Sequence, residues 1–363
     1  MPFWLKCVSS MILPSGSFRR VVTTLTGVRA AVARARCASV IGGIAVLTVS
    51  AVYAQRGAPQ PSRPDNEQSL SHVTAARKLA GDDAFLAVPL NFYCVPGNAR
   101  AQNNNAPDLE PVRLFDNLYA VGNSETTVYA LTSSAGIVLL DAGFENKAEA
   151  LEAQLRALRL DPANVKYILL GHGHADHFGG AKFFQDKYGT KIAASAADWD
   201  LINPPGAQAG ATGRGGGGAK PVKDLVLAEG QPFQFGDLTV TPIAIPGHTP
   251  GALAFVFPVK DKGQTRMAGL FGGTVLTTGI LTTDALKQYV QSIAHYIDVA
   301  KRLNVEVEVQ NHPIFDGMPD RLASLKARPA DPNPFVIGTD RYVRMWTVVS
   351  ECMQAEIARR EGA

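Results

Sequence analysis

Hydrophobic and polar residues along the chain form two β-rich blocks, each followed by segments with helical periodicity. In the first block, strand-like runs at 112–121 and 126–141 are interrupted by turn residues, a pattern typical of consecutive hairpin strands. Leucines at helical spacing predict a helix over 147–160, and a short apolar run predicts a strand over 165–170. Another helix is expected to begin near Gly179.

The second block is expected to contain four strands, at 225–227, 233–245, 253–258 and 267–271. A helix near 284–303 and a last strand over 305–310 follow. The apolar face of this helix is formed by Leu286, Val290, Ile293 and Ile297. A closing helix is expected to bury a stripe of larger side chains, Tyr342, Trp346, Val349, Met353 and Ile357.

Two such blocks predict an α/β fold in which two mixed β-sheets pack face to face with helices outside, a four-layer αβ/βα sandwich. A doubly wound parallel sheet is the alternative. The hairpin signals disfavour it, since they imply antiparallel pairing, and no GxGxxG follows the first strand. Residues 67–363 are expected to form one domain. Within it, the glycine-rich segment 206–219 is either a flexible surface loop or a flap over an active site.

The N-terminal region differs in charge from the rest of the chain. Of the 35 basic residues, six lie in residues 1–54, which have no acidic residue, so residues 55–363 have 29 basic and 32 acidic residues and a net charge of −3. An uncharged apolar run, 38–53, ends at Ala54 with small residues at the cleavage-determining positions. This pattern predicts a signal peptide over 1–54 and a periplasmic or secreted protein. An uncleaved membrane anchor is the alternative.

The amino-acid composition indicates a globular protein and argues against a nucleic-acid-binding function. The chain has 363 residues, 46% of them hydrophobic and 18% charged, which is typical of a globular protein. Outside the leader the basic residues are not clustered, which argues against nucleic-acid binding.

Residues 55–66 are rich in proline and polar residues and are expected to form a flexible linker. Of the four cysteines, only Cys94 and Cys352 lie beyond the leader, and they are either a disulfide or two free thiols.

Histidines carry the strongest chemical signal. Five of the seven lie in three short segments, 172–177 (HGHADH), 246–251 (PGHTPG) and 311–313 (NHP), each directly after a strand-like run. The other two, His72 and His295, lie in helical segments and are expected to be surface or packing residues.

The spacing within HGHADH suits metal binding. In an extended stretch, side chains two positions apart project to the same side, so His172 and His174 can reach one ion. The turn at Ala175 then directs Asp176 and His177 to the other side of a shared cavity. Nitrogen and oxygen ligands without a thiolate favour zinc, and six of them can be divided three and three between two ions.

These motifs resemble those of the metallo-β-lactamase fold superfamily, over most of residues 110–330. The pattern looks most like the third subclass of class B β-lactamases, whose second zinc is held by Asp, His and His. The resemblance implies that His172, His174 and His248 hold the first zinc and that Asp176, His177 and His312 hold the second. Asp176 would also be catalytic, orienting the metal-bound hydroxide that attacks the carbonyl.

One departure bears on the substrate. After the strand at 267–271 the chain reads Gly272-Gly273-Thr274, where many hydrolases of the superfamily have a metal-bridging Asp. Thr274 is nearest to the Ser usual in the third subclass, and Thr277 and Thr278 are candidate substrate contacts. We therefore expect a dizinc hydrolase that opens a cyclic amide in a small-molecule substrate, that is, a β-lactamase. A hydrolase of lactones or other carboxylic esters is the alternative, and a zinc-binding protein without catalysis is disfavoured because open coordination positions remain.

Overall fold

The computed structural model describes residues 63–96, 103–204, 219–274, 276, 278, 281–327 and 332–362. The predicted signal peptide, the linker residues before 63, nearly all of the glycine-rich segment and Thr277 lie outside the described residues. The fold below is that of the described part of the chain.

The first sheet has seven strands in the order β1 to β7. Strands β1 to β4 pair antiparallel, and β4 to β7 pair parallel, so the sheet is mixed. Their bounds are β1 (Val112–Phe115), β2 (Leu118–Gly122), β3 (Thr127–Ser133), β4 (Gly136–Leu140), β5 (Val165–Leu169), β6 (Lys191–Ser195) and β7 (Leu225–Leu227).

The second sheet has five strands in the order β12-β11-β10-β9-β8. Strands β8 to β11 pair antiparallel and β12 lies parallel to β11, so this sheet is mixed as well. Their bounds are β8 (Phe233–Phe235), β9 (Leu238–Ala244), β10 (Leu253–Asp261), β11 (Gln264–Phe271) and β12 (Val305–Val309).

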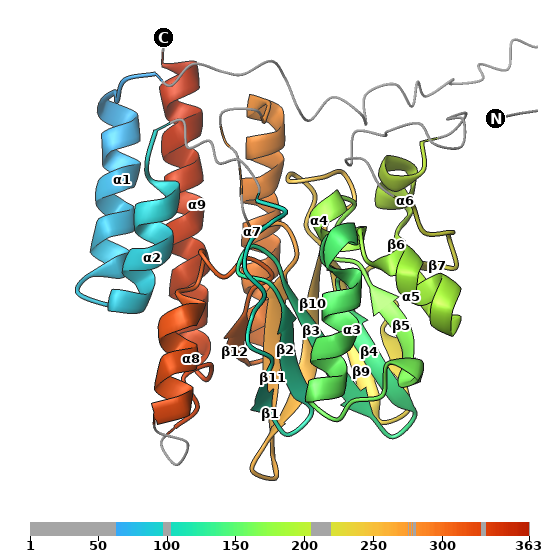
Figure 1. Cartoon of the computed structure of the whole chain (residues 1–363). Helices are drawn as coiled ribbons and strands as arrows, with labels where there is room; N and C mark the ends of the chain where they lie inside the picture. Colours follow the sequence, from blue (N-terminus) through green and yellow to red (C-terminus); the bar gives the residue numbers. More distant parts are fainter. Residues whose placement is uncertain are drawn as a thin grey trace, which may run out of the picture. The chain divides into compact units, whose positions relative to one another are not determined.

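Helices cover the outer faces of both sheets (Figure 1). Those beside the first sheet are α3 (Ala148–Ala157), α5 (Ala181–Tyr188) and α6 (Ala196–Ile202), with the one-turn helix α4 (Ala175–Phe178) and the 3₁₀ turns η2 (Glu145–Lys147) and η3 (Pro162–Asn164). Those beside the second are α1 (Glu67–Ala80), α2 (Ala84–Tyr93), α7 (Thr283–Arg302) and α9 (Thr339–Glu361), and α8 (Met318–Ala327) follows β12. None of the helices in the described ranges has the length and apolar character needed to cross a bilayer.

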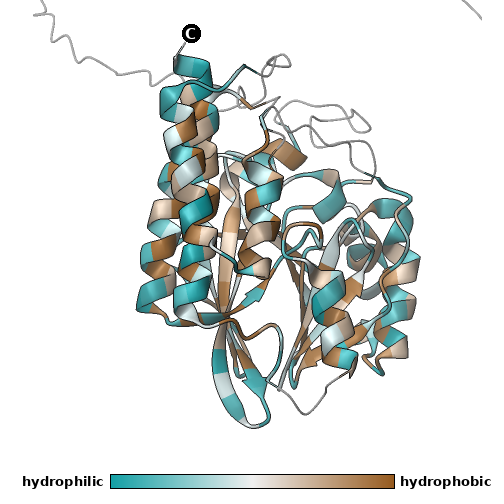
Figure 2. Ribbon diagram, turned by 90° about the vertical axis from the view of Figure 1, so that its left-hand side faces the viewer, coloured by the Kyte–Doolittle hydropathy of each residue, from teal (hydrophilic) through white to brown (hydrophobic). Residues whose placement is uncertain are grey.

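Three buried clusters connect these layers. Figure 2 shows hydrophobic residues along the strands of both sheets and hydrophobic and hydrophilic residues alternating along the helices. One cluster lies between the two sheets and joins Leu140 and Leu169 of the first to Phe255 and Leu270 of the second. The other two pack each sheet against its own helices. The predicted four-layer sandwich is therefore confirmed, and the doubly wound parallel sheet is excluded.

Two predicted strands are each a hairpin instead. The segment 233–245 divides into β8 and β9 because Gly236 has a φ of 59°, a left-handed conformation that an extended strand cannot contain. The segment 112–121 divides at Asn117, whose side-chain oxygen accepts a hydrogen bond from the Lys260 backbone nitrogen of the opposite sheet. In both cases a polar turn interrupts an apolar run too briefly to change its overall pattern.

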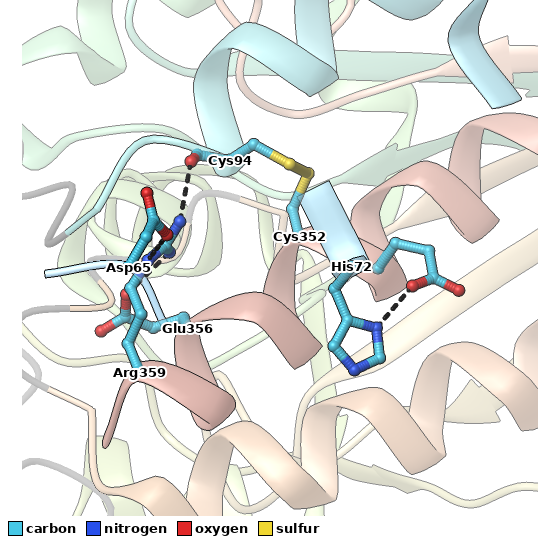
Figure 3. The surroundings of a disulfide bond; sticks show 7 residues. Asp65, His72, Cys94, Cys352, Glu356 and Arg359 are labelled. Atoms are coloured by element: carbon cyan, nitrogen blue, oxygen red, sulfur yellow. Dashed lines mark hydrogen bonds and ion pairs between the residues drawn. A yellow bond between two sulfur atoms is a disulfide. The ribbon is translucent and has the colours of Figure 1, made fainter. Parts of the chain in front are cut away.

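A disulfide between Cys94 and Cys352 joins the end of α2 to α9 (Figure 3). Of the two alternatives left open by the sequence, the structure has the disulfide. Beside it, the Arg359 guanidinium donates to the Asp65 carboxylate at 2.8 Å and to the Cys94 carbonyl. Asn66 caps α1 and donates to the Ala358 carbonyl. The last residues of the predicted linker are thus bonded to α9.

Candidate metal centre

All three histidine segments lie where strands end. Because β4 and β5 are parallel, the residues after them, Asp141 and the 171–177 segment, lie at one edge of the first sheet. In the second sheet β9, β11 and β12 run in the same direction, so the 246–251 segment, Gly272-Gly273 and His312 lie at one edge too. The two edges meet, since the Leu253 backbone nitrogen donates to the Gly171 carbonyl at 2.8 Å. All six predicted ligands are brought together here, and all are buried.

Three of the histidines converge on a common point. The distances His172 Nε2 to His174 Nδ1, His172 Nε2 to His248 Nε2 and His174 Nδ1 to His248 Nε2 are each 3.0 Å. We call these three residues the first metal group. Two of these histidines follow a strand of the first sheet and one follows a strand of the second. The packing of the two sheets against each other therefore determines the distances between the three ring nitrogens.

The other three predicted ligands form a second metal group beside it. His177 Nε2 lies 3.2 Å from His312 Nε2 and 3.2 Å from Asp176 Oδ2, and His312 Nε2 lies 3.6 Å from Asp176 Oδ2. The His172 and His177 ring centroids are 3.9 Å apart, so the two groups are adjacent.

Both groups fit zinc. Zinc binds imidazole nitrogen at about 2.0–2.1 Å in tetrahedral geometry, which separates two such nitrogens by roughly 3.3 Å. The observed separations of 3.0 to 3.6 Å bracket that value. Asp176 is fully buried; its Oδ2 faces the imidazoles of His177 and His312, and its Oδ1 has no hydrogen-bond partner among the described residues. A buried carboxylate oxygen without a hydrogen bond is costly unless a cation is bound nearby.

Hydrogen bonds from the outer ring nitrogens orient three of the imidazoles. His172 Nδ1 donates to the Gly272 carbonyl at 2.5 Å, and His312 Nδ1 donates to the Glu125 carbonyl at 2.7 Å. These carbonyl acceptors place the ring proton on Nδ1, which leaves Nε2 with a lone pair facing the site. His177 Nδ1 pairs in the same way with Asp141 Oδ2 at 2.8 Å.

Burial and charge give the histidines different proton affinities. Burial, followed by the neighbouring imidazoles, holds the pKa of His172 well below its usual range. Burial and His177 lower the pKa of His312 to about 4. For His177, burial acts to lower the pKa, but the carboxylates of Asp176 and Asp141 outweigh it and raise the pKa to about 10. A metal ion binding at His177 Nε2 therefore displaces a proton.

Asp141 is a candidate site residue that was not among the predicted ones. Its Oδ1 accepts from the Gly171 backbone nitrogen at 2.7 Å, and its Oδ2 accepts from His177 Nδ1 and from Asn311 Nδ2 at 3.1 Å. It adopts a φ of 65°, a strained conformation for a non-glycine residue of the kind that clusters at functional sites. An aspartate directly after a buried apolar strand was the available signal.

Of the predicted substrate contacts, Thr274 and Thr278 are both buried and bonded to other parts of the chain. Thr274 is fully buried, and its hydroxyl donates to Asn311 Oδ1 at 3.1 Å. Thr278 is buried too, and its carbonyl accepts from the Arg360 side chain. The two remaining histidines lie outside both metal groups, since His72 Nδ1 bonds Glu351 at 2.7 Å and His295 bonds Glu229.

Comparison with known proteins points to one superfamily. Residues 121–261 match a family model described as "Metallo-beta-lactamase superfamily", a stretch that contains every candidate ligand except His312. The solved structure of BJP-1, a subclass B3 metallo-β-lactamase of Bradyrhizobium japonicum, is similar with a TM-score of 0.56 and 26% identity. That similarity covers 68% of this chain and 90% of BJP-1.

Curated relatives bear other names. A hydroxyacylglutathione hydrolase of Cereibacter sphaeroides is 31% identical over 159 residues, which are 41% of this chain and 55% of the relative. A UPF0173 metal-dependent hydrolase of Myxococcus xanthus is 27% identical over 246 residues, covering 62% of this chain and 85% of the relative. The chain spans about half the length of the hydroxyacylglutathione hydrolases it matches.

Proposed function

Since this chain contains a metallo-β-lactamase superfamily domain, we propose that it is an exported dizinc hydrolase that opens cyclic amides, with β-lactams as its substrates. The observation that carries the proposal is the pair of adjacent metal groups, which together offer five imidazoles and a single carboxylate. The likeness to BJP-1, which is named a subclass B3 metallo-β-lactamase, supports it.

The chain's own residues have separate tasks in this reaction. The first metal group would hold one zinc and the second metal group the other, and bound zinc supplies Lewis acidity and lowers the pKa of a water molecule. The two oxygens of Asp176 can serve different partners: Oδ2, which faces His177 and His312, would hold the metal. Oδ1 is left to accept a hydrogen bond from the attacking hydroxide and to aim it at the carbonyl.

The position after β11 favours amide over ester substrates. There Thr274 presents a hydroxyl bonded to Asn311, and no carboxylate stands at this position to bridge two metals. A metal ion held by the second metal group would then be balanced by the single carboxylate of Asp176, and it would supply positive charge near the leaving nitrogen of a strained lactam. The names of the curated relatives favour a second candidate, a hydrolase of lactones, other carboxylic esters or a thioester such as hydroxyacylglutathione.

A substrate panel separates these two candidates. We expect the protein purified from residue 55 onward to contain two zinc ions by elemental analysis. We expect its kcat/KM for a chromogenic cephalosporin to exceed that for a homoserine lactone and for a hydroxyacylglutathione by about 100-fold or more. Zinc-loaded protein that hydrolyses the lactone or the glutathione thioester and no penicillin, cephalosporin or carbapenem would contradict the lactamase assignment.

Export is supported by the leader and by the disulfide. Disulfides persist in oxidising compartments outside the cytosol, and Cys94 is bonded to Cys352. We expect fractionation of the native host to place the protein in the periplasm or medium, with Gln55 as the first residue in N-terminal sequencing. Protein retained in the membrane with an intact leader would favour the uncleaved anchor instead.

A further inference from the structure

Asp198 is a buried acid on helix α6 that the proposed reaction does not use. The helix begins after Ser195, whose hydroxyl accepts a hydrogen bond from the Asp198 backbone nitrogen at 3.1 Å. In the sequence Asp198 therefore looks like an acidic residue in the first turn of an ordinary capped helix. Its side chain, however, is fully buried and makes no bond to its own helix.

The Asp198 carboxylate instead joins the two segments that carry the first metal group. Its Oδ2 accepts from the Gly173 backbone nitrogen and from the Thr249 hydroxyl, both at 2.8 Å. Its Oδ1 accepts from the Gly251 backbone nitrogen at 3.0 Å. Gly173 stands between His172 and His174, and Thr249 directly follows His248, so one side chain is bonded next to all three imidazoles.

Close packing keeps this arrangement in place. A Cβ atom at Gly251 would lie 2.0 Å from Ser195 Oγ and 2.9 Å from Asp198 Oδ1, so only glycine fits beside the carboxylate. A Cβ atom at Gly173 would lie 3.1 Å from the Asp198 carbonyl. The 246–251 segment and the 171–174 segment are thus held against the start of α6.

The burial of this carboxylate is unfavourable by itself. Burial raises the pKa of Asp198 to about 6, although the bonds from Thr249, Gly173 and Gly251 act to lower it. In the described part of the chain no Lys or Arg forms an ion pair with it. A buried carboxylate that accepts hydrogen bonds from two backbone amides and a hydroxyl contributes little to the free energy of unfolding. This argues that its role is to orient the two segments to which it is bonded.

We propose that Asp198 is the positioning residue of the first metal group, holding the 171–174 and 246–251 segments at the spacing that makes their three imidazole nitrogens a preformed zinc site. This inference rests on the proposed dizinc function. Residues behind metal ligands orient them and typically change metal affinity by about 10- to 100-fold when replaced.

The test is zinc affinity in two backgrounds, measured by competition with a chromophoric chelator. In the His177→Ala protein the first metal group is the intact one, and Asp198→Asn is expected to weaken its zinc binding about 10- to 100-fold. In the His248→Ala protein the second metal group remains, and the same substitution is expected to leave its affinity within about 2-fold. Asp200→Asn, on the exposed side of the same helix, is the matched control and should change neither.

Thr249 supplies a milder variant should Asp198→Asn fold poorly. Thr249→Val removes the hydroxyl donor at similar volume and is expected to weaken the first site about 3- to 10-fold, whereas Thr249→Ser, which keeps the hydroxyl, restores the affinity. Unchanged zinc affinity in Asp198→Asn and Thr249→Val, with only a lower melting temperature, would overturn the proposal.

If the wild-type protein binds two zinc ions without hydrolysing any carbonyl substrate, the proposed function fails while the positioning role stands. If it binds none, both fail.

Discussion

Replacing His248 by alanine is expected to lower kcat/KM for the lactam substrate by roughly 1,000-fold or more. His248 is the one member of the first metal group that comes from the second sheet, and its Nε2 lies 3.0 Å from both His172 Nε2 and His174 Nδ1. Without it, two imidazoles remain, one fewer than catalytic zinc sites use. The measurement is steady-state hydrolysis of a chromogenic cephalosporin together with zinc content, which should fall from two to one.

A matched control is His295→Ala on helix α7. That imidazole is half-exposed and pairs with Glu229 outside both metal groups, so its loss should leave turnover and zinc content unchanged. Removing zinc from the wild-type protein with a chelator should mimic His248→Ala, and adding zinc back should restore activity in the wild type only. A His248→Ala protein that keeps wild-type turnover would show that the first metal group is not the reaction centre.

The second large effect concerns the disulfide. Replacing Cys352 by alanine is expected to lower the free energy of unfolding by about 2–5 kcal/mol. The bond closes a loop with a sequence separation of 258 between α2 and α9, and opening so long a loop greatly enlarges the unfolded ensemble. Urea unfolding of the zinc-free variant, followed by fluorescence, measures the change.

The matched comparison is wild-type protein with and without a reductant. Reduction should lower the urea midpoint of the wild type to that of Cys352→Ala and leave the variant unaffected. Because Cys352 packs in the cluster between the second sheet and its helices, the folded variant should keep its kcat/KM well below the unfolding temperature. Equal midpoints for oxidised and reduced wild type would contradict the assigned role of the bond.

Much of the fold could be predicted because its elements are long or strongly periodic. The stripe of α9 at Tyr342, Trp346 and Val349 is fully buried, as its helical spacing indicated. The hairpin at Gly236 escaped detection because a two-residue turn changes one φ angle without changing the apolar pattern around it. Helices α2 and α8 fall outside the predicted elements, and α1 was indicated only by the helical segment around His72, because its buried face consists of the small or short side chains Ser69, Val73, Ala76 and Ala80.

The site divides in the same way. The spacing of the three histidines and the aspartate in HGHADH indicates metal binding, so four candidate ligands could be predicted from one short segment. Thr274 was expected to contact substrate. In the structure its hydroxyl donates a hydrogen bond to Asn311, which lies 37 positions away, and no local sequence pattern predicts this contact. That bond does not exclude a substrate contact, and the role of Thr274 remains a prediction.

By itself the sequence determined the residue types, the two β-rich blocks and the strand-end positions of the histidines, because hydrophobic periodicity and short-range spacing are local properties of the chain. Only the tertiary structure decided that Cys94 meets Cys352, that Asp141 orients His177, and that Asp198 connects the two segments around the first metal group. Each of those contacts joins residues 25 to 258 positions apart. Such contacts depend on how the sheets and helices pack, which no window of sequence contains.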